Sequence, residues 1–129
     1  MLVVAAALVD GEGRVLVQRR PPGKSLAGLW EFPGGKPESG ESPELALVRE
    51  LREELGIEVS APDLTAAAFA SEALGERHLI LLLYLCRGWT DVPKPLHATE
   101  LRWVTLFELR QLAMPPADLP LITALEKLL

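Results

Sequence analysis

The chain of 129 residues suits one domain with a substantial apolar core, because 49% of its residues are hydrophobic. Its formal net charge of −5 argues against binding to nucleic-acid polymers, which normally requires a basic surface. A metal ion can still bring a nucleotide to an acidic site. The single cysteine, Cys86, excludes an intrachain disulfide.

The apolar segments do not suggest targeting or membrane insertion. Residues 1–9 are apolar, but no basic segment and no cleavage site accompany them, so we expect no signal peptide. The apolar run at residues 79–85 is far too short to cross a bilayer. We therefore expect a cytoplasmic protein with no membrane partner, forming one domain over residues 1–129.

Hydrophobic patterning predicts two strands at the start of the chain. Residues 2–9 form an apolar run, residues 10–13 read DGEG, and residues 14–20 alternate as a strand does, so we expect a hairpin. The proline and glycine of residues 21–28 indicate a loop, and residues 30–32 a short extended segment.

The rest of the chain mixes helices and strands irregularly. We predict strands at 64–70, 78–86 and 101–104, with helices at 106–112 and 119–129. Because strands and helices do not alternate regularly, we expect an α/β fold with a mixed sheet and helices packed on it.

A helix begins near Ser42. Ser42 is a typical N-cap, Pro43 fits the first helical position, and Gly56 is a typical C-terminal cap. The predicted buried stripe consists of Leu45, Val48, Leu51 and Leu55.

Three carboxylates gather on this helix. At a rotation of about 100° per residue, Glu50, Glu53 and Glu54 fall within one sector that faces away from the stripe. A solvated glutamate-rich face is one interpretation. The other is a hard divalent cation such as Mg²⁺, which prefers oxygen ligands, with Gly34 and Gly35 letting the backbone come close.

The spacing around these glutamates favours the second interpretation. From Gly35 the chain reads Gly-x5-Glu-x7-Arg-Glu-Leu-x-Glu-Glu-x-Gly-Ile. This pattern resembles the Nudix box, and every fixed position of the box is matched over residues 35–57. The resemblance implies the Nudix fold, an α/β/α sandwich with a mixed central sheet and a catalytic loop-helix. It also implies a hydrolase that uses Mg²⁺.

Segments outside the box are similar to the MutT-type branch of that family. They are VQRR (17–20), LWEFPGGK (29–36), RHLILLLY (77–84), LRWV (101–104) and PPADLPLI (115–122). The likeness implies a nucleoside triphosphate pyrophosphohydrolase that uses Mg²⁺, with Mn²⁺ as a substitute. It would convert oxidised nucleotides such as 8-oxo-dGTP to the monophosphate and pyrophosphate.

The resemblance assigns roles in the acidic site. The implied metal ligands are Gly34, through its carbonyl, with Glu50, Glu53 and Glu54. Glu53 or Glu50 would orient or deprotonate the attacking water, and Arg49 would hold the glutamates in place by ion pairs. Glu41 would support a second metal, and Gly35 would support the same site.

The resemblance also assigns substrate contacts. Arg20 and Arg77 match positions that approach the nucleotide phosphates or base, with a structural ion pair as the alternative for each. Phe32 is the candidate wall of the base pocket.

Two positions depart from the 8-oxoguanine-specific pattern. Asp118 stands where those members carry asparagine, and an ionised aspartate only accepts hydrogen bonds, which suits donors such as the cytosine amino group. Asp118 as the N-cap of the last helix is the structural alternative. His97 stands where relatives often carry a glutamate that assists catalysis, although Glu100 is nearby.

These departures leave alternatives open. One is a pyrophosphohydrolase of CTP or a modified cytidine triphosphate. Another is a Nudix-fold module that binds nucleotides without cleaving them, which the intact glutamates disfavour. We expect a small nucleoside triphosphate as the partner, no nucleic-acid polymer, and a monomer or homodimer.

Overall fold

The computed structural model describes the whole chain, Met1–Leu129. Its strands are β1 (Leu2–Leu8), β2 (Val15–Arg19), β3 (Trp30–Glu31), β4 (Gly34–Gly35), β5 (Leu64–Leu74), β6 (Arg77–Cys86) and β7 (Glu100–Val104). Its α-helices are α1 (Pro43–Leu55), α2 (Leu106–Gln111) and α3 (Leu119–Leu128), and the short 3₁₀ helices are η1 (Ala61–Asp63) and η2 (Pro116–Asp118). Each predicted strand and helix is present. β5 runs beyond the predicted end at residue 70, because its last residues pair with the start of β6.

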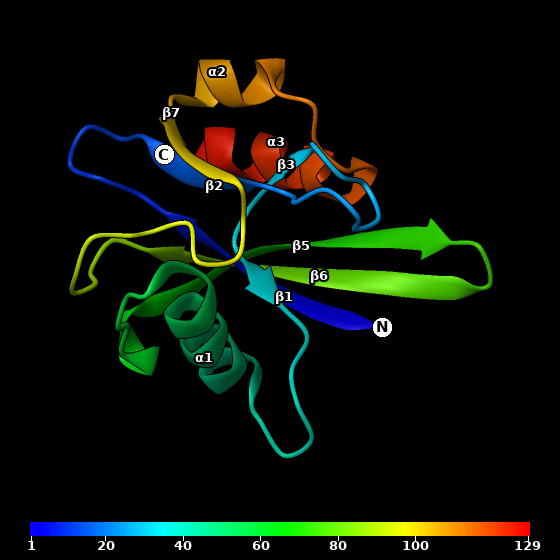
Figure 1. Ribbon diagram of the computed structural model, residues 1–129, viewed down its shortest axis with the longest axis horizontal. Helices are drawn as coiled ribbons and strands as arrows, with labels where there is room; N and C mark the ends of the chain where they lie inside the picture. The colour runs from blue at the N-terminus through cyan, green and yellow to red at the C-terminus, as the bar shows by residue number, and fades with distance from the viewer.

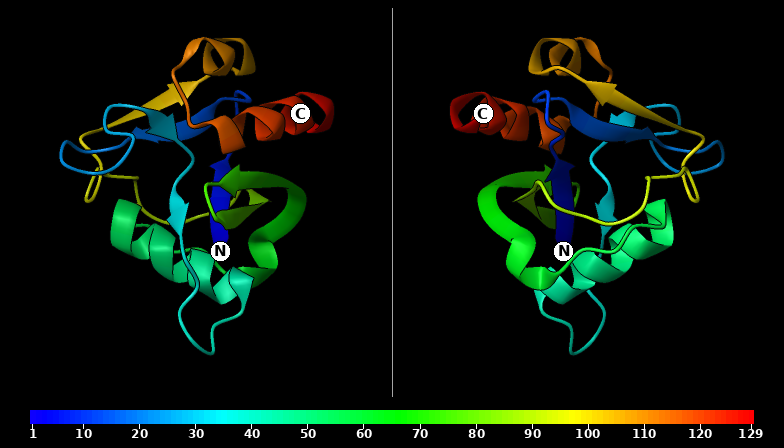
Figure 2. Two further views of the ribbon diagram at one scale, coloured as in Figure 1. Left: turned by 90° about the vertical axis from the view of Figure 1, so that its right-hand side faces the viewer. Right: turned by 90° about the vertical axis from the view of Figure 1, so that its left-hand side faces the viewer.

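The strands form two sheets, a four-stranded sheet of order β4-β1-β6-β5 and a three-stranded sheet of order β3-β2-β7. In the first sheet β1 runs parallel to β6 and antiparallel to β4, so this sheet is mixed. Helix α1 lies on one side of it, and α2, α3 and the three-stranded sheet lie on the other (Figures 1 and 2). The predicted sandwich with a mixed central sheet is confirmed, and the second sheet is an addition to it. None of the helices combines the length and the apolar character needed to span a bilayer.

The predicted hairpin of residues 2–9 and 14–20 is wrong. The turn forms, with the Asp10 carboxylate accepting a hydrogen bond from the backbone N–H of Arg14, but only an isolated bridge between Val9 and Val15 joins the two strands. β1 and β2 enter different sheets, and each is an inner strand of its own sheet. For that reason residues 15–18 are buried on both faces instead of alternating between core and solvent.

Alternate residues of β1 supply two apolar clusters on opposite faces of the four-stranded sheet. Val4, Ala6 and Leu8 pack in the cluster that contains the buried residues of α1. Ala5 and Ala7 pack in the cluster that contains the buried residues of α3. Because side chains alternate along a strand, this one short strand anchors both layers.

Helix α1 begins and ends as predicted. The Ser42 hydroxyl accepts a hydrogen bond from the Leu45 amide, and Gly56 adopts the left-handed conformation with φ of 69°. The predicted stripe is partly wrong, since Leu45 is 56% exposed. The buried residues of the helix are Ala46, Leu47, Leu51, Glu54 and Leu55. The buried face is therefore rotated toward Leu47 and includes a carboxylate.

The two residues of β4 pass through a space that admits no side chain. A Cβ at Gly34 would lie 1.9 Å from the backbone oxygen of Val4, on the strand with which β4 pairs. A Cβ at Gly35 would lie 2.5 Å from the carboxyl carbon of Glu50 on α1. The paired glycines thus bring the backbone against β1 on one side and against the acidic helix on the other.

We predict that Gly34→Ala destabilises the protein severely, because the added Cβ meets backbone that cannot move without breaking the β1–β4 pairing. Overpacking of this kind costs about 3 kcal/mol, and we expect the melting temperature to fall by about 8 °C or more. The control is Gly11→Ala, where an added Cβ meets nothing within 4 Å. Equal melting temperatures for the two variants would contradict this account of β4.

Candidate active site

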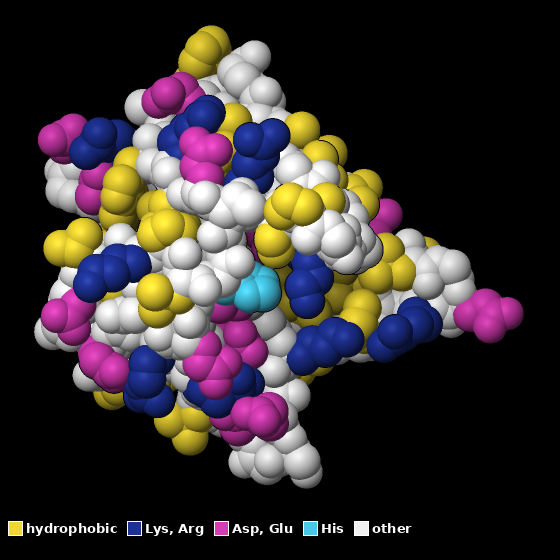
Figure 3. Space-filling view, in the orientation of Figure 1, with side chains coloured by type: hydrophobic (Ala, Val, Ile, Leu, Met, Phe, Trp, Pro, Cys, Tyr) yellow, Lys and Arg dark blue, Asp and Glu magenta, His cyan; other side chains and the backbone are white.

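A cavity of about 460 Å³ lies beside β1 and β4, and it is lined by residues from both sheets, from α1 and from η2. The corresponding face of the molecule is hollowed, with basic and acidic side chains around the hollow (Figure 3). Its volume suits a small molecule of nucleotide size. Glu54 lies at one end of the lining, and Asp118 lies in another part of it.

Glu54 is buried at the acidic end of the cavity. Its Oε1 accepts a hydrogen bond of 2.6 Å from the side-chain amide of Gln18 and a longer one of 3.4 Å from the Gly34 N–H. The Glu50 carboxyl lies within hydrogen-bonding reach. Burial and the adjacent Glu50 raise the pKa of Glu54 to about 8, and the bonds from Gln18 and Gly34 offset this rise only in part.

The predicted single carboxylate face is therefore corrected. Glu54 belongs to the buried side of α1, whereas the side chain of Glu53 is 58% exposed and the largely buried Glu50 lies between them. A fully solvated glutamate face is excluded by the burial of Glu54. In this arrangement the three carboxylates do not converge, and no three acidic, histidine or cysteine side chains of the chain form a ready-made metal site.

Arg49 connects the helix to the loop before it. Its guanidinium contacts Glu41 at 2.8 and 2.9 Å, Glu50 at 3.0 Å and Glu53 at 3.3 Å, and Glu38 at 2.9 Å. These partners raise the pKa of Arg49, and Arg49 holds the pKa of Glu41 at about 2. Arg49 does not line the cavity, so the structure agrees with an arginine that holds the glutamates in place.

The donor set fits a divalent metal. Glu50 and Glu54 place two carboxyls side by side with no cation against Glu54, and a hard cation would compensate the pair. Gly34 and Gly35 line the cavity next to them and bring backbone groups close. Glu53 completes an oxygen set only when its contact with Arg49 is exchanged for the metal.

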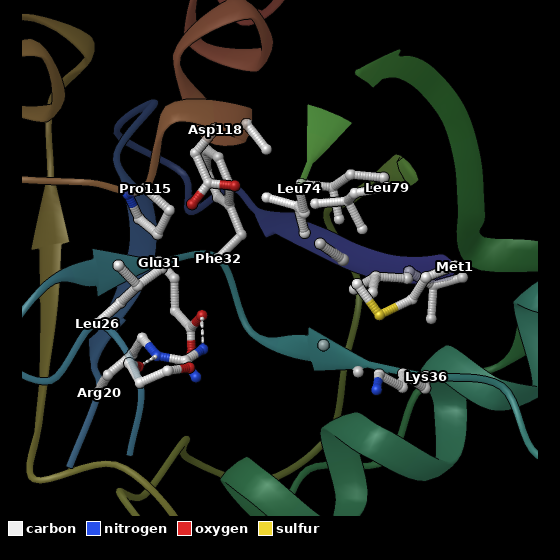
Figure 4. Close-up of a pocket in the computed structure, with 18 of the residues that line it drawn as sticks. Met1, Arg20, Leu26, Glu31, Phe32, Lys36, Leu74, Leu79, Pro115 and Asp118 are labelled. Carbon is white, nitrogen blue, oxygen red and sulfur yellow. Dashed lines mark hydrogen bonds and ion pairs between the residues drawn. The ribbon is translucent and has the colours of Figure 1, made fainter. Parts of the chain in front are cut away.

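Asp118 lies on η2 at another part of the cavity wall. It is 5% exposed, and burial together with the charge of Glu31 raises its pKa to about 7, while Arg20 acts in the opposite direction. Phe32 also lines the cavity, and Figure 4 shows both side chains at its wall. Asp118 does occupy the N-cap position of α3, as the structural alternative predicted, but it has helical dihedral angles and its side chain makes no capping hydrogen bond.

Arg20 lies in the same part of the cavity and forms the ion pair that the alternative interpretation predicted. Its Nη1 is 2.8 Å from Glu31 Oε2, and its Nε donates to the backbone oxygen of Ser25 at 2.8 Å (Figure 4). Arg20 and Glu31 both line the cavity. Arg20 therefore forms a structural ion pair and also faces the cavity, so the two predicted alternatives are both true of it.

The remaining predicted residues divide into those at the cavity and those away from it. Arg77 lines the cavity, and its Nη2 lies 3.4 Å from the Met1 sulfur. His97 is exposed and lines the cavity as well. Glu100 does not line it, and instead lies 3.6 Å from the guanidinium of Arg19.

Sequence reasoning missed three polar residues of the site. Lys36 and Glu31 line the cavity, and Gln18 holds Glu54. Lys36 and Glu31 lie inside the LWEFPGGK segment, whose likeness to the MutT-type branch assigns no role to either residue. Gln18 follows three buried apolar residues in β2, and a polar residue in such a run was the available signal.

The comparison with known families agrees with this geometry. A family profile described as NUDIX domain matches residues 4–124. The chain therefore belongs to the Nudix family, as the spacing of residues 35–57 predicted. Within that family it is a hydrolase that acts on small nucleotide substrates and uses a divalent metal.

Three similar proteins span nearly the whole chain. A CTP pyrophosphohydrolase of Escherichia coli K12 is 39% identical, over 96% of this chain and 90% of the relative. An 8-oxo-dGTP diphosphatase of the same organism is 33% identical, over 98% of each. The solution structure of the E. coli ORF135 protein superposes with a TM-score of 0.87 and 37% identity, over 98% of this chain and 89% of that one.

We predict that Glu54→Gln stabilises the metal-free protein at pH 8. The pKa of Glu54 rises from 4.5 to about 8 on folding, so its contribution is complete below pH 4.5 and is lost as the pH rises toward 8. Glutamine carries no charge to be buried, and we expect a melting temperature about 4 °C or more above that of the wild type at pH 8.

The control for this prediction is Glu58→Gln, which changes an exposed glutamate paired with Arg52. Thermal unfolding of both variants and the wild type from pH 5 to 8, with a chelator present, gives the comparison. An unchanged pH dependence in Glu54→Gln would contradict the burial of a charge at this position.

Proposed function

We propose that the protein is a Mg²⁺-dependent nucleoside triphosphate pyrophosphohydrolase of the MutT type that acts on 8-oxo-dGTP and related oxidised nucleotides. The observation that carries the choice of base is the state of Asp118. This carboxyl is buried in the cavity wall, with a pKa raised to about 7, so much of it is protonated near neutral pH.

A protonated carboxyl has the hydrogen-bonding capacity of an asparagine amide. Its O–H donates and its carbonyl oxygen accepts, whereas the ionised form only accepts. The protonated form of Asp118 suits guanine O6 as an acceptor together with the N7–H of 8-oxoguanine as a donor. Burial thus supports the 8-oxoguanine assignment despite the absence of asparagine. The aromatic ring of Phe32, which lines the same cavity, offers a wall for the base.

The phosphates are assigned to the part of the cavity near α1. Lys36 and Arg77 line the cavity without an ion-pair partner, so their charges are available to phosphoryl oxygens. Glu50, Glu53, Glu54 and the Gly34 carbonyl are the proposed ligands of the metal. When bound, Mg²⁺ supplies neutralisation of the phosphoryl charge and activation of water.

The chain's own residues then orient the reaction. Arg49 keeps Glu50 and Glu53 in place through its hydrogen bonds, and Glu53 or Glu50 accepts the proton of the attacking water. The water oxygen bonds to the β phosphorus, and the bond to the oxygen shared with the α phosphorus breaks. The products are the nucleoside monophosphate and pyrophosphate.

CTP, or a modified cytidine triphosphate, is the second candidate substrate. Ionised Asp118 accepts hydrogen bonds only, which suits the cytosine amino group. The relative described as a CTP pyrophosphohydrolase, at 39% identity, supports this candidate. The two candidates correspond to the two protonation states of one side chain.

We predict that base preference depends on pH. The ratio of protonated to ionised Asp118 falls tenfold per pH unit, so kcat/KM for 8-oxo-dGTP relative to CTP should fall by up to about 100-fold from pH 6 to pH 8. Effects of pH on the metal site are common to both substrates and cancel in the ratio. Steady-state kinetics with dGTP and 5-methyl-dCTP included would define the base specificity.

Asp118→Asn is the matched variant, because its amide donates and accepts at every pH. We expect it to retain activity toward 8-oxo-dGTP, to have reduced activity toward CTP and to show a ratio of the two that does not change with pH across this range. A wild-type ratio that does not change with pH would show that Asp118 does not read the base.

We predict that Glu53→Gln lowers kcat by about 100-fold or more, because glutamine neither takes a proton nor binds a metal as carboxylate does. Mg²⁺-dependent release of pyrophosphate from 8-oxo-dGTP is the measurement. Glu58→Gln is the control, since Glu58 has a similar exposure of 53% and also pairs with an arginine. Full turnover by the Glu53→Gln variant would show that Glu53 is not a catalytic residue. A wild-type protein that turns over none of these nucleotides would instead favour a module that binds nucleotides without cleaving them.

A further inference from the structure

Gln18 is a polar residue at a fully buried position. It lies on β2, the middle strand of the three-stranded sheet, and is 1% exposed. Its backbone is in register with Glu31 of β3 on one side and Leu101 of β7 on the other. Its side chain extends from the sheet toward α1, where the amide N–H donates the 2.6 Å hydrogen bond to Glu54. A rigid strand thus carries the amide to the acidic end of the cavity.

The other half of the Gln18 amide has no partner. Its Oε1 is the one buried side-chain oxygen or nitrogen of the protein without a hydrogen bond. An unpaired buried acceptor costs about 1–3 kcal/mol, and an apolar side chain of the same shape avoids that cost. The hydrogen bond to the buried Glu54 offsets this cost, and it distinguishes Gln18 from its apolar neighbours Leu16 and Val17.

The two carboxylate oxygens of Glu54 have different surroundings. Oε1 receives both the Gln18 amide and the Gly34 N–H. Oε2 receives no N–H donor from the protein, and the Glu54 side chain lines the cavity within hydrogen-bonding reach of the Glu50 carboxyl. One oxygen is thus fixed by the two sheets, and the other is left for a ligand.

We propose that Gln18 is a positioning residue for the divalent metal, which it never touches: its amide holds Oε1 of Glu54 so that Oε2 stays directed to the cavity. This inference rests on the metal site of the proposed function. An outer partner of this kind fixes the orientation of the metal ligand, and removal of such a partner typically lowers metal affinity by about 10–100-fold.

The variant that tests this is Gln18→Met, which keeps the length of the side chain and removes its hydrogen bond. Mn²⁺ binding, followed by the electron paramagnetic resonance of the free ion without nucleotide, measures metal affinity directly. We expect the dissociation constant to rise at least about tenfold. The melting temperature of the metal-free variant should stay close to that of the wild type, because removal of the unpaired Gln18 oxygen offsets the loss of the hydrogen bond to Glu54.

Leu16→Met is the matched control. Leu16 is fully buried, two residues away on the same face of β2, and packs in the cluster that contains α1. We expect its Mn²⁺ affinity to stay within twofold of the wild type. A Gln18→Met protein with unchanged Mn²⁺ affinity would overturn the proposal, as would equal losses of affinity in both variants, which would indicate packing.

The wild-type protein offers a test that does not depend on the folding of a variant. The side-chain amide protons of Gln18, assigned by ¹⁵N nuclear magnetic resonance, should shift as a diamagnetic metal such as Mg²⁺ is added and should saturate with it. If the chemical shifts of these amide protons do not change when the metal binds, the proposal is overturned. If the wild type binds neither Mn²⁺ nor Mg²⁺, the metal site itself fails, whereas an unexpected substrate preference affects neither measurement.

Discussion

The site depends on the two glycines of β4, whose backbone lies close to both β1 and α1 because it carries no side chains. β4 lies against β1 at Gly34 and against the Glu50 carboxyl of α1 at Gly35, in gaps too small for a Cβ. Because β1 is an inner strand that anchors both apolar clusters, this contact fixes the acidic helix relative to the whole core. The loop between β4 and α1 is then held by Arg49, which joins Glu41 to Glu50 and Glu53.

The cavity combines two regions in which burial acts on carboxyl groups with different consequences. Near α1, the pKa of Glu54 is raised by burial next to a second carboxyl, an arrangement that a divalent cation relieves. At η2, burial raises the pKa of Asp118 without a second carboxyl in contact, and no cation is required. One region therefore suits a metal with its phosphates, and the other suits a hydrogen-bonding base. The Arg20–Glu31 ion pair lies in the second region and contributes to the charge that Asp118 experiences.

Local signals in the sequence predicted the elements well, because caps and turns are encoded by adjacent residues. Ser42 and Gly56 bound α1 as expected, and the acidic motif lies on it. The sheet to which each strand belongs is a long-range property, so the DGEG turn could not reveal that β1 and β2 separate. The exposure of Leu45 and the burial of Glu54 likewise depend on how far α1 is rotated on the sheet, which helical periodicity alone does not fix. The role of Gln18 is not predicted because the one hydrogen-bond partner of its side chain, Glu54, lies 36 residues away.

The shared oxygen of Glu54 has a mechanical consequence. Gln18 reaches it from the three-stranded sheet and Gly34 reaches it from the four-stranded sheet, so a single atom is fastened to both layers. A sliding movement of one layer over the other must lengthen one of these two bonds relative to the other and turn the carboxylate. The alignment of the two layers therefore bears directly on the orientation of this carboxylate.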